Sequence, residues 1–333
     1  MYLYKYAYIS FCVSMKNMKK YRVGELFAGI GGIGLGFQEA GFELTWANEI
    51  DEKACITYSK NFNHLLIHKD MTQVDPNELP NIDILTGGFP CQAFSIAGYR
   101  KGFNDDRGNL FFDILRYIEI LNPKVVFLEN VKNLTAHDNG RTFNIIQKEL
   151  TKAGYYIRSN VLNTANYSDV PQNRERIYIV CFKNKTLAEK FKFPNPVKNT
   201  RTVRSLFETN VSEDFSYKKT KYYAQLKSEM KNPNTIYQWR RIYVRENKNN
   251  LCPTLTANMG TGGHNVPLII DEKNDIRKLT PRECARFQGF PDSYKLPENL
   301  PNSALYKQIG NSVSVPIIYA IAQNILKVLK DTE

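Results

Sequence analysis

Residues 82–95 read IDILTGGFPCQAFS, an apolar run that stops at two glycines and a proline and is followed at once by a cysteine. A short apolar run ended by Gly and Pro predicts a buried strand that enters a loop. Open α/β sheets bind their ligands at the carboxyl ends of strands. Cys91 is therefore predicted to lie where chemistry takes place, although a lone cysteine is more often a small packing residue.

The chain on either side alternates β-prone and helical segments. We expect strands at 21–27, 43–48, 64–68, 82–85, 123–128, 155–163 and 176–182, and helices at 52–60, 110–121 and 142–153. The first strand leads into AGIGGIG, residues 28–34, and then into a helical pattern, so the glycines can let the backbone approach a ligand closely. This alternation predicts an α/β fold with a doubly wound sheet.

Polar residues follow several of these strands. Glu49 comes about 20 residues after the glycine turn, the spacing at which an acid holds ribose hydroxyls. Asp51, Asp70 and Glu129 also follow strands. A solvated loop explains any one of these residues, but four acids and Cys91 at successive strand ends favour one shared site.

Composition narrows the class of protein. The chain of 333 residues has 45 Lys and Arg against 33 Asp and Glu, a formal net charge of +12. Such a charge favours a nucleic-acid partner over an arbitrary basic surface. Six scattered cysteines without a C-x-x-C pair argue against a zinc ribbon or a disulfide framework and for a reducing cytoplasm. We expect no metal site, and no apolar run predicts a membrane span.

Residues 184–275 break the alternation and are rich in Lys and Asn. They contain YQWRRIYVR at 237–245 and TLTANMGTGGHN at 254–265. Basic residues interleaved with aromatics, followed by a glycine-rich loop, predict a nucleic-acid reader; the alternative is a solvated insertion. After it, LTPRE at 279–283 predicts a capped helix with Pro in its first turn, and residues 317–329 predict a last amphipathic helix.

Cys91, Glu129 and the RER segment at 174–176 can meet at one edge of the sheet. A thiolate is a strong nucleophile, and nearby cations lower its pKa. A carboxylic acid can protonate a ring nitrogen, and an arginine can hold a carbonyl oxygen. Thiol addition to carbon 6 of a pyrimidine makes carbon 5 nucleophilic, so this set suits a pyrimidine that accepts an electrophilic methyl group.

The ordered motifs resemble those of bacterial DNA (cytosine-5)-methyltransferases, the HhaI-like modification enzymes of restriction systems. They are FAGIGG (27–32), NEID (48–51), GFPCQ (88–92), ENV (129–131), QNRER (172–176) and GNSV (310–313). The resemblance implies the Rossmann-like fold of S-adenosylmethionine-dependent methyltransferases, with a smaller, mostly irregular or β target-recognition domain. The implied parts are a dispensable extension (1–20), a catalytic domain (21–183), a target-recognition domain (184–277) and a C-terminal segment (278–333) whose last helix returns to the catalytic domain.

The resemblance also implies roles for the matching residues. Cys91 adds to carbon 6 of a cytosine flipped out of double-stranded DNA, Glu129 protonates ring nitrogen 3, Arg176 contacts the base carbonyl and Arg174 supports the pocket. The implied S-adenosyl-L-methionine site consists of Phe27, Gly29, Gly31, Glu49, Ile50, Asp70, Met71, Pro90, Leu110, Asn311 and Ser312. The implied DNA contacts are Ser95, Gln238, Arg240, Arg241 and Thr254, with Gln238 where related enzymes place the residue that fills the vacated stack.

Two positions depart from the family pattern: Ile50, where close relatives carry Trp, and Glu25, where Asp is common. The reader stretch at 238–267 resembles readers of short GC-rich palindromes with an unread centre. We expect a cytoplasmic bacterial monomer that protects host DNA from a cognate restriction endonuclease sharing its site.

Two other functions fit part of the sequence. An NAD-dependent oxidoreductase explains the glycine turn and Glu49 but gives no role to Cys91, Glu129 or the basic insertion. A catalytically inactive DNA-binding relative is disfavoured because Cys91, Glu129 and Arg176 are all present.

Overall fold

The computed structural model describes residues 20–89, 110–240, 242–247, 249–261 and 264–331 of the chain. Four residues of the predicted site, Pro90, Cys91, Ser95 and Arg241, lie outside these ranges.

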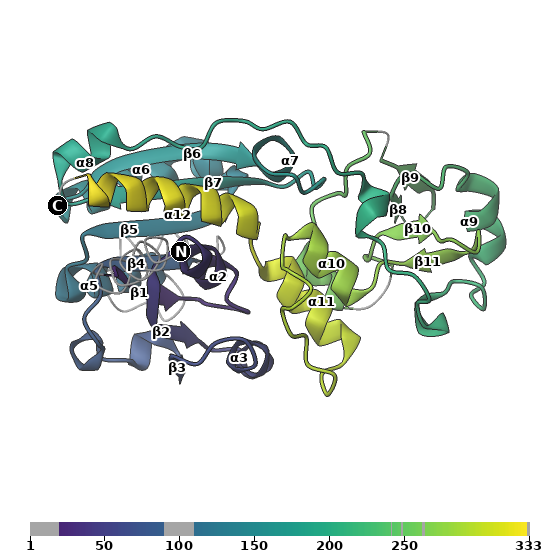
Figure 1. The fold of residues 1–333 in the computed structure, drawn as a ribbon, viewed down its shortest axis with the longest axis horizontal. Coiled ribbons are helices and arrows are strands. Elements are labelled where there is room, and N and C mark those ends of the chain that lie inside the picture. Colours follow the sequence, from purple (N-terminus) through teal and green to yellow (C-terminus); the bar gives the residue numbers. More distant parts are fainter. Residues whose placement is uncertain (1–19, 90–109, 241, 248, 262–263, 332–333) are drawn as a thin grey trace, which may run out of the picture.

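A seven-stranded sheet organises the larger part of the molecule, with the order β3-β2-β1-β4-β5-β7-β6 (Figure 1). The strands from β3 to β5 pair in parallel, whereas β7 runs antiparallel to β5 and to β6. The predicted doubly wound α/β sheet is confirmed, with one antiparallel strand inserted near its edge. Its strands are β1 (Arg22–Leu26), β2 (Glu43–Glu49), β3 (Leu65–His68), β4 (Ile84–Gly88), β5 (Val125–Val131), β6 (Tyr156–Asn163) and β7 (Glu175–Phe182).

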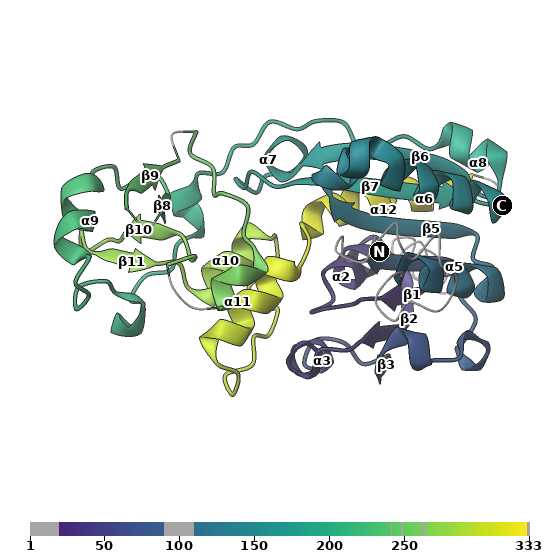
Figure 2. The same cartoon turned by 180° about the vertical axis from the view of Figure 1, so that it is seen from behind.

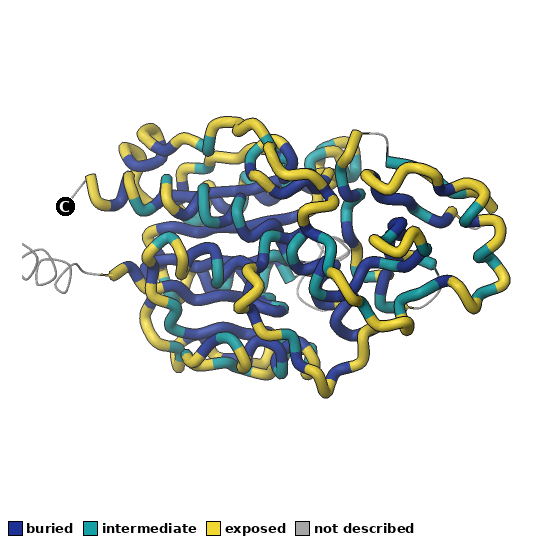
Figure 3. The backbone as a smooth tube through the Cα atoms, turned by 45° about the vertical axis from the view of Figure 1, so that its right-hand side comes forward, coloured by how far each residue is buried: buried dark blue, intermediate teal, exposed yellow. Residues whose placement is uncertain are grey.

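Helices cover both faces of this sheet, as Figures 1 and 2 show from opposite sides. One core contains Val125 and Phe127 of β5 together with side chains of α2 (Gly32–Glu39), α8 (Lys185–Lys190) and α12 (Val315–Lys330). The opposite core contains Val126 and Leu128 with α5 (Leu110–Leu121) and α6 (Arg141–Lys152). Successive strand residues point to opposite faces, so the apolar run of β5 supplies both cores. Figure 3 shows the strands of this sheet as mostly buried.

The smaller part contains a four-stranded antiparallel sheet with the order β11-β10-β8-β9. Its strands are β8 (Tyr237–Trp239), β9 (Val244–Glu246), β10 (Leu268–Ile270) and β11 (Ile276–Lys278), and α9 (Tyr223–Glu229) packs on them. This smaller antiparallel sheet confirms the predicted second part of the fold, which was expected to be mostly irregular or β. A third core joins the two parts, because it combines Ala28 and Tyr58 with Leu255, Ile269 and Phe287.

The remaining helices are α3 (Glu52–Ser59), α7 (Thr164–Tyr167), α10 (Pro281–Phe287) and α11 (Asn302–Asn311). The predicted cap of α10 is confirmed as a capping box, in which Thr280 and Glu283 each bond the other's backbone N–H. The sequence did not predict α11, whose N-cap is Pro301 without a side-chain cap. GNSV therefore spans the end of a helix rather than a loop.

The segment Asn302–Lys330 is long and apolar enough to cross a membrane, with a mean hydropathy of 1.5 in an 18-residue window. The sequence analysis predicted no membrane span in this segment. Its apolar side chains, including Ile317, Ile321 and Ile325, belong to the core on the α2 face of the sheet. We interpret α11 and α12, which make up this segment, as helices that pack in the core of the protein.

A buried carboxyl group lies beneath the glycine turn. Glu25 accepts hydrogen bonds from the Gly34 N–H at 3.1 Å and from the Tyr58 hydroxyl at 3.3 Å. A Cβ atom at position 34 would lie 2.6 Å from Glu25 Oε2, so only glycine leaves room for the carboxyl group. Burial raises the pKa of Glu25 to about 8, although the hydrogen bonds from Gly34 and Tyr58 oppose that rise. The folded chain therefore holds a proton on Glu25 at neutral pH.

This proton predicts a pH dependence of stability that Glu25→Gln removes. The folded pKa lies above the unfolded value, so the favourable contribution is complete below about pH 4.5 and is lost as the pH rises through about 8. Relative to the variant, the wild type should lose on the order of 4 kcal/mol of unfolding free energy between pH 5 and pH 9. Urea unfolding of both proteins across this range measures the difference. If the unfolding free energies of the two proteins had the same pH dependence, the pKa of Glu25 would not be raised in the folded state.

Candidate active site

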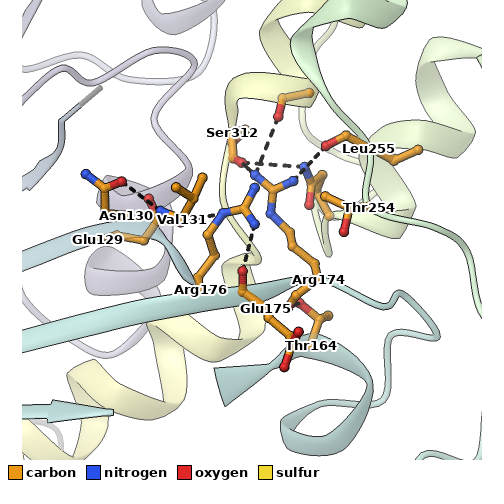
Figure 4. Close-up of polar contacts among 12 residues, drawn as sticks. Glu129, Asn130, Val131, Thr164, Arg174, Glu175, Arg176, Thr254, Leu255 and Ser312 are labelled. Atoms are coloured by element: carbon orange, nitrogen blue, oxygen red, sulfur yellow. Dashed lines mark hydrogen bonds and ion pairs between the residues drawn. The ribbon is translucent and has the colours of Figure 1, made fainter. Parts of the chain in front are cut away.

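The end of β5 and the start of the antiparallel strand β7 bring an acid and a cation together (Figure 4). Glu129 Oε1 lies 3.1 Å from Arg176 Nε, and both side chains are largely buried. The contact is an ion pair only, because Glu129 Oε1 has no hydrogen-bond partner in the described part of the chain. Burial raises the pKa of Glu129, and the charges of Arg176 and Arg174 act against that rise. This oxygen can therefore still bond a ligand, and the acid keeps its proton to a higher pH than an ordinary glutamate.

The end of β4 lies next to this pair. Gly88 pairs with Glu129 across the two strands, and the Asn130 side-chain amide donates to the Phe89 carbonyl at 2.8 Å. Phe89 is the last described residue before Pro90 and Cys91. The chain thus enters the predicted nucleophile segment directly beside Glu129.

Arg174, two residues before Arg176, has a different environment. Its side chain is 2% exposed, and its guanidinium donates to the carbonyl of Leu255 at 2.7 Å and to those of Gly310 and Ser312. Burial lowers the pKa of Arg174 to about 9, so the group is still charged at neutral pH. Figure 4 shows this side chain turned toward Leu255 and Ser312. Arg174 therefore joins the large sheet, the reader segment (residues 184–275) and the end of α11.

A cavity of about 480 Å³ opens between the glycine turn, the ends of β2, β4 and β5, and α11. Phe27 and Gly29 line it with φ angles of 54° and 56°, in the left-handed region that side chains rarely adopt. The Glu49 carboxylate accepts from the N–H groups of Gly29 at 2.6 Å, Ile50 at 2.9 Å and Asp51 at 2.8 Å. Three backbone donors thus hold this carboxylate at the cavity wall.

Some of the other predicted cofactor residues line the cavity and some do not. Asn311 and Ser312 line it. Gly31 does not; a Cβ there would lie 2.3 Å from the Phe62 ring, so this glycine serves packing, and Gly32 lines the cavity instead. Four predicted residues lie outside the lining of the cavity. Ile50 is exposed, and Asp70 accepts a hydrogen bond from the Thr72 N–H and so caps a 3-10 turn. Met71 is buried in the core beneath α5, and Leu110, the first residue of α5, is partly buried.

Sequence reasoning missed an ion pair at the cavity. Lys307 Nζ on α11 lies 2.9 Å from Asp51 Oδ2, and both residues line the cavity, as do Thr256 and Ala257 of the reader segment. No periodicity could have shown this, because it depends on packing between Lys307 of α11 and residues 50 to 256 positions away. Among the described residues, no three His, Cys, Asp or Glu side chains gather as a metal site requires.

Three of the predicted DNA-contacting residues meet at a second hollow of about 510 Å³. Gln238, Arg240 and Thr254 line it together with Arg245 and Asn173. The Thr254 hydroxyl donates to the Asn173 carbonyl at 2.6 Å, one residue from Arg174. Residues 173–174 and 254–256 therefore connect this hollow to the cavity of about 480 Å³.

Comparison with known proteins agrees with this arrangement. The family model described as C-5 cytosine-specific DNA methylase matches residues 21–327. The Type II methyltransferase M.Bsp6I of Bacillus sp. (strain RFL6) is 53% identical over 312 residues, covering 92% of this chain and 98% of the relative. M.HhaI of Haemophilus parahaemolyticus is 39% identical, covering 93% and 95%. The S. pombe Dnmt2 structure, 20% identical, shares the fold with a TM-score of 0.74 over 93% of this chain and 99% of its own.

The contact between α11 and the reader segment predicts a strict requirement for Gly310. A Cβ atom there would lie 2.2 Å from the Thr256 carbonyl carbon, where backbone meets backbone. Gly310→Ala should lower the unfolding free energy by about 2–4 kcal/mol, because neither segment can move aside cheaply.

Urea unfolding measures this loss, and Gly87→Ala is the control. A Cβ atom at Gly87 would meet its nearest neighbour, the Leu26 carbonyl oxygen, at an ordinary 3.5 Å. Equal losses in the two variants would mean that the contact at Gly310 is not tight.

Proposed function

The chain belongs to the C-5 cytosine-specific DNA methylase family, and we propose that it transfers a methyl group from S-adenosyl-L-methionine to carbon 5 of a cytosine flipped out of double-stranded DNA. As a DNA (cytosine-5)-methyltransferase related to Type II enzymes, it would protect host DNA within a restriction–modification system. The observation that carries the proposal is the Glu129–Arg176 pair at the cavity edge, beside the end of β4.

The cavity fits the proposed cofactor. Its volume of about 480 Å³ suits a small-molecule site. Glu49 Oε2 accepts one hydrogen bond, from Gly29, and keeps capacity for a ribose hydroxyl. Phe27 would stack on the adenine, with Gly29, Asn311 and Ser312 completing the wall. When bound, S-adenosyl-L-methionine supplies an electrophilic methyl group.

The family resemblance adds further cofactor contacts to the proposal. Asp70 would bind the adenine amino group and Ile50 would cover the ring, with Met71, Pro90 and Leu110 nearby. Gly31 keeps a packing role in the same turn.

Each catalytic side chain then has one task. The Cys91 thiolate forms a bond to carbon 6 of the cytosine, and the displaced electron pair makes carbon 5 nucleophilic. Glu129 gives its proton to ring nitrogen 3, while Arg176 donates hydrogen bonds to the carbonyl oxygen. The methyl group would come from the sulfonium, which departs as a neutral thioether. A water molecule then accepts the proton of carbon 5, the thiolate leaves carbon 6, and ring nitrogen 3 returns its proton to Glu129, which restores the ring. Arg174 does not touch the base but holds the pocket wall through Leu255 and Ser312.

The basic hollow beside the cavity is the proposed DNA face. Gln238, Arg240 and Thr254 line it, and Arg241 and Ser95 would add contacts from outside the described residues. Arginines suit phosphate and guanine contacts. We propose that the protein acts as a cytoplasmic monomer and shares its DNA site with a cognate restriction endonuclease.

No observation favours an NAD-dependent oxidoreductase as a second function. The family match spans residues 21–327, and hydride transfer gives no task to the Glu129–Arg176 pair.

Bisulfite sequencing of DNA from methylation-deficient cells that express the chain tests the reaction and names its site. We expect methylated cytosines within one short GC-rich palindrome with an unread centre. Cells that express Cys91→Ser should contain none, because an alcohol is a far weaker nucleophile than a thiolate. Unmodified DNA beside folded wild-type protein would refute the reaction, and an active Cys91→Ser would refute the covalent mechanism.

Glu129→Gln tests the acid. The amide preserves shape but cannot give up a proton, so the single-turnover rate should fall by about 100-fold or more. Cofactor affinity should be little changed. The wild-type rate should fall as the pH rises through the raised pKa of Glu129, because the acid form is then lost. A near-normal rate in Glu129→Gln would remove Glu129 from the acid role.

A further inference from the structure

A chain of hydrogen bonds extends from the buried carboxyl group of Glu25 toward the surface. The Tyr58 hydroxyl lies 3.3 Å from Glu25 Oε2 and 2.8 Å from His64 Nε2. Glu25 and Tyr58 are each 1% exposed, whereas His64 is only partly buried. The proposed reaction assigns no task to these three side chains.

Glu25 and Tyr58 lie beneath the glycine turn that forms one wall of the cavity of about 480 Å³. The Gly34 N–H donates to Glu25 Oε1 at 3.1 Å, and a Cβ atom at Gly31 would lie 2.9 Å from the Tyr58 ring. Gly29, two residues before Gly31, lines the cavity itself. The turn and the first residues of α2 therefore touch both the cavity and the buried pair.

Charge at the cavity acts on Glu25. Burial raises the pKa of Glu25 to about 8, and the carboxylate of Glu49, which lines the cavity, adds to that rise. The hydrogen bonds from Gly34 and Tyr58 oppose it. Tyr294 is a further titratable neighbour, and burial together with the charge of Glu25 raises its pKa, so its hydroxyl stays neutral. A positive charge in the cavity would act in the opposite sense to Glu49 and favour the ionised form of Glu25.

The proposed reaction changes the charge in the cavity. The sulfonium of S-adenosyl-L-methionine is positive, and the thioether that is left after methyl transfer is neutral. The adenine, ribose and amino-acid parts of the two molecules are the same, so residues that bind those parts distinguish them poorly. A titratable group beside the cavity responds to the charge instead. This step rests on the proposed function.

We propose that Glu25 distinguishes the charged cofactor from its neutral product, by releasing a proton when the sulfonium is bound and taking one up when the thioether remains. The ionised carboxylate stabilises the positive charge. The protein therefore prefers the cofactor to the product most strongly at a pH where Glu25 can ionise.

Tyr58 and His64 form the path of the released proton. A hydroxyl group both donates and accepts, so Glu25 Oε2 can pass its proton to Tyr58 while Tyr58 passes its own to His64 Nε2. Burial lowers the pKa of His64, so its ring is neutral and accepts this proton. His64 then loses its Nδ1 proton to solvent, and the net change is one proton moved from Glu25 to water.

The test is isothermal titration calorimetry of the full-length protein at pH 8, in two buffers of different ionisation enthalpy, which counts the protons released per ligand. On binding S-adenosyl-L-methionine, the wild type should release about 0.3–0.4 proton more than Glu25→Gln, because a nearby positive charge lowers the pKa of Glu25 by about 0.5–1. With S-adenosyl-L-homocysteine the two proteins should release the same number. Protons from the ligands' own groups cancel in this difference.

The same titrations give affinities. Between pH 6.5 and pH 9, the affinity of the wild type for the cofactor relative to the product should rise by about three- to tenfold more than that of Glu25→Gln. The matched control is Glu119→Gln, which replaces an exposed glutamate of α5 and should agree with the wild type in both measurements.

Tyr58→Phe tests the proposal independently of the folding of Glu25→Gln. It removes a hydrogen bond that lowers the pKa of Glu25. Proton release on cofactor binding should therefore be smaller than in the wild type at pH 7 and larger at pH 9.

Equal proton release by the wild type and Glu25→Gln with the sulfonium cofactor would overturn the proposal, as would the same excess release with the thioether or an unchanged pH profile in Tyr58→Phe. In each of these cases the cofactor still binds, so the proposed function stands. If neither ligand bound the folded wild type, the proposed function would fail and this proposal with it.

Discussion

Arg174 places a buried positive charge among the carbonyl groups of two other chain segments, and the geometry of the site depends on it. The large sheet, the reader segment at Leu255 and the end of α11 meet at this one guanidinium. Burying such a charge is unfavourable unless its donors are used, so the three segments are held in one arrangement. The cavity that Arg174 lines and the hollow that the neighbouring Asn173 lines are therefore held in a fixed position relative to each other.

The sequence predicted the parts of the site that follow from strand ends. Glu129 and Arg176 were expected at one edge of the sheet, Glu129 after one apolar run and Arg176 at the start of another, and they lie 3.1 Å apart. Glu49 was expected from its distance to the glycine turn, and it lies at the cavity. The direction of β7 was not predicted, because a buried strand has the same apolar pattern in a parallel and an antiparallel neighbourhood.

The parts that sequence reasoning missed depend on contacts between distant segments. Lys307 meets Asp51, and Gly310 packs on Thr256, only because α11 lies against the reader segment. A resemblance locates motifs but not exposure, so it could not show that Gly31 is covered by Phe62. The raised pKa of Glu25 could not be predicted either, because it depends on burial, and the sequence showed only Glu at a position where Asp is common.

The position of α12 has a consequence for biosynthesis. Its isoleucines complete the same core as Val23 of β1 and Phe37 of α2, so β1 is covered by residues 315–330, which are synthesised long after it. While the ribosome is still adding those residues, one face of the sheet lacks its apolar cover and the catalytic half cannot reach its final state. This face of the sheet therefore reaches its final packing only after α12 has been synthesised.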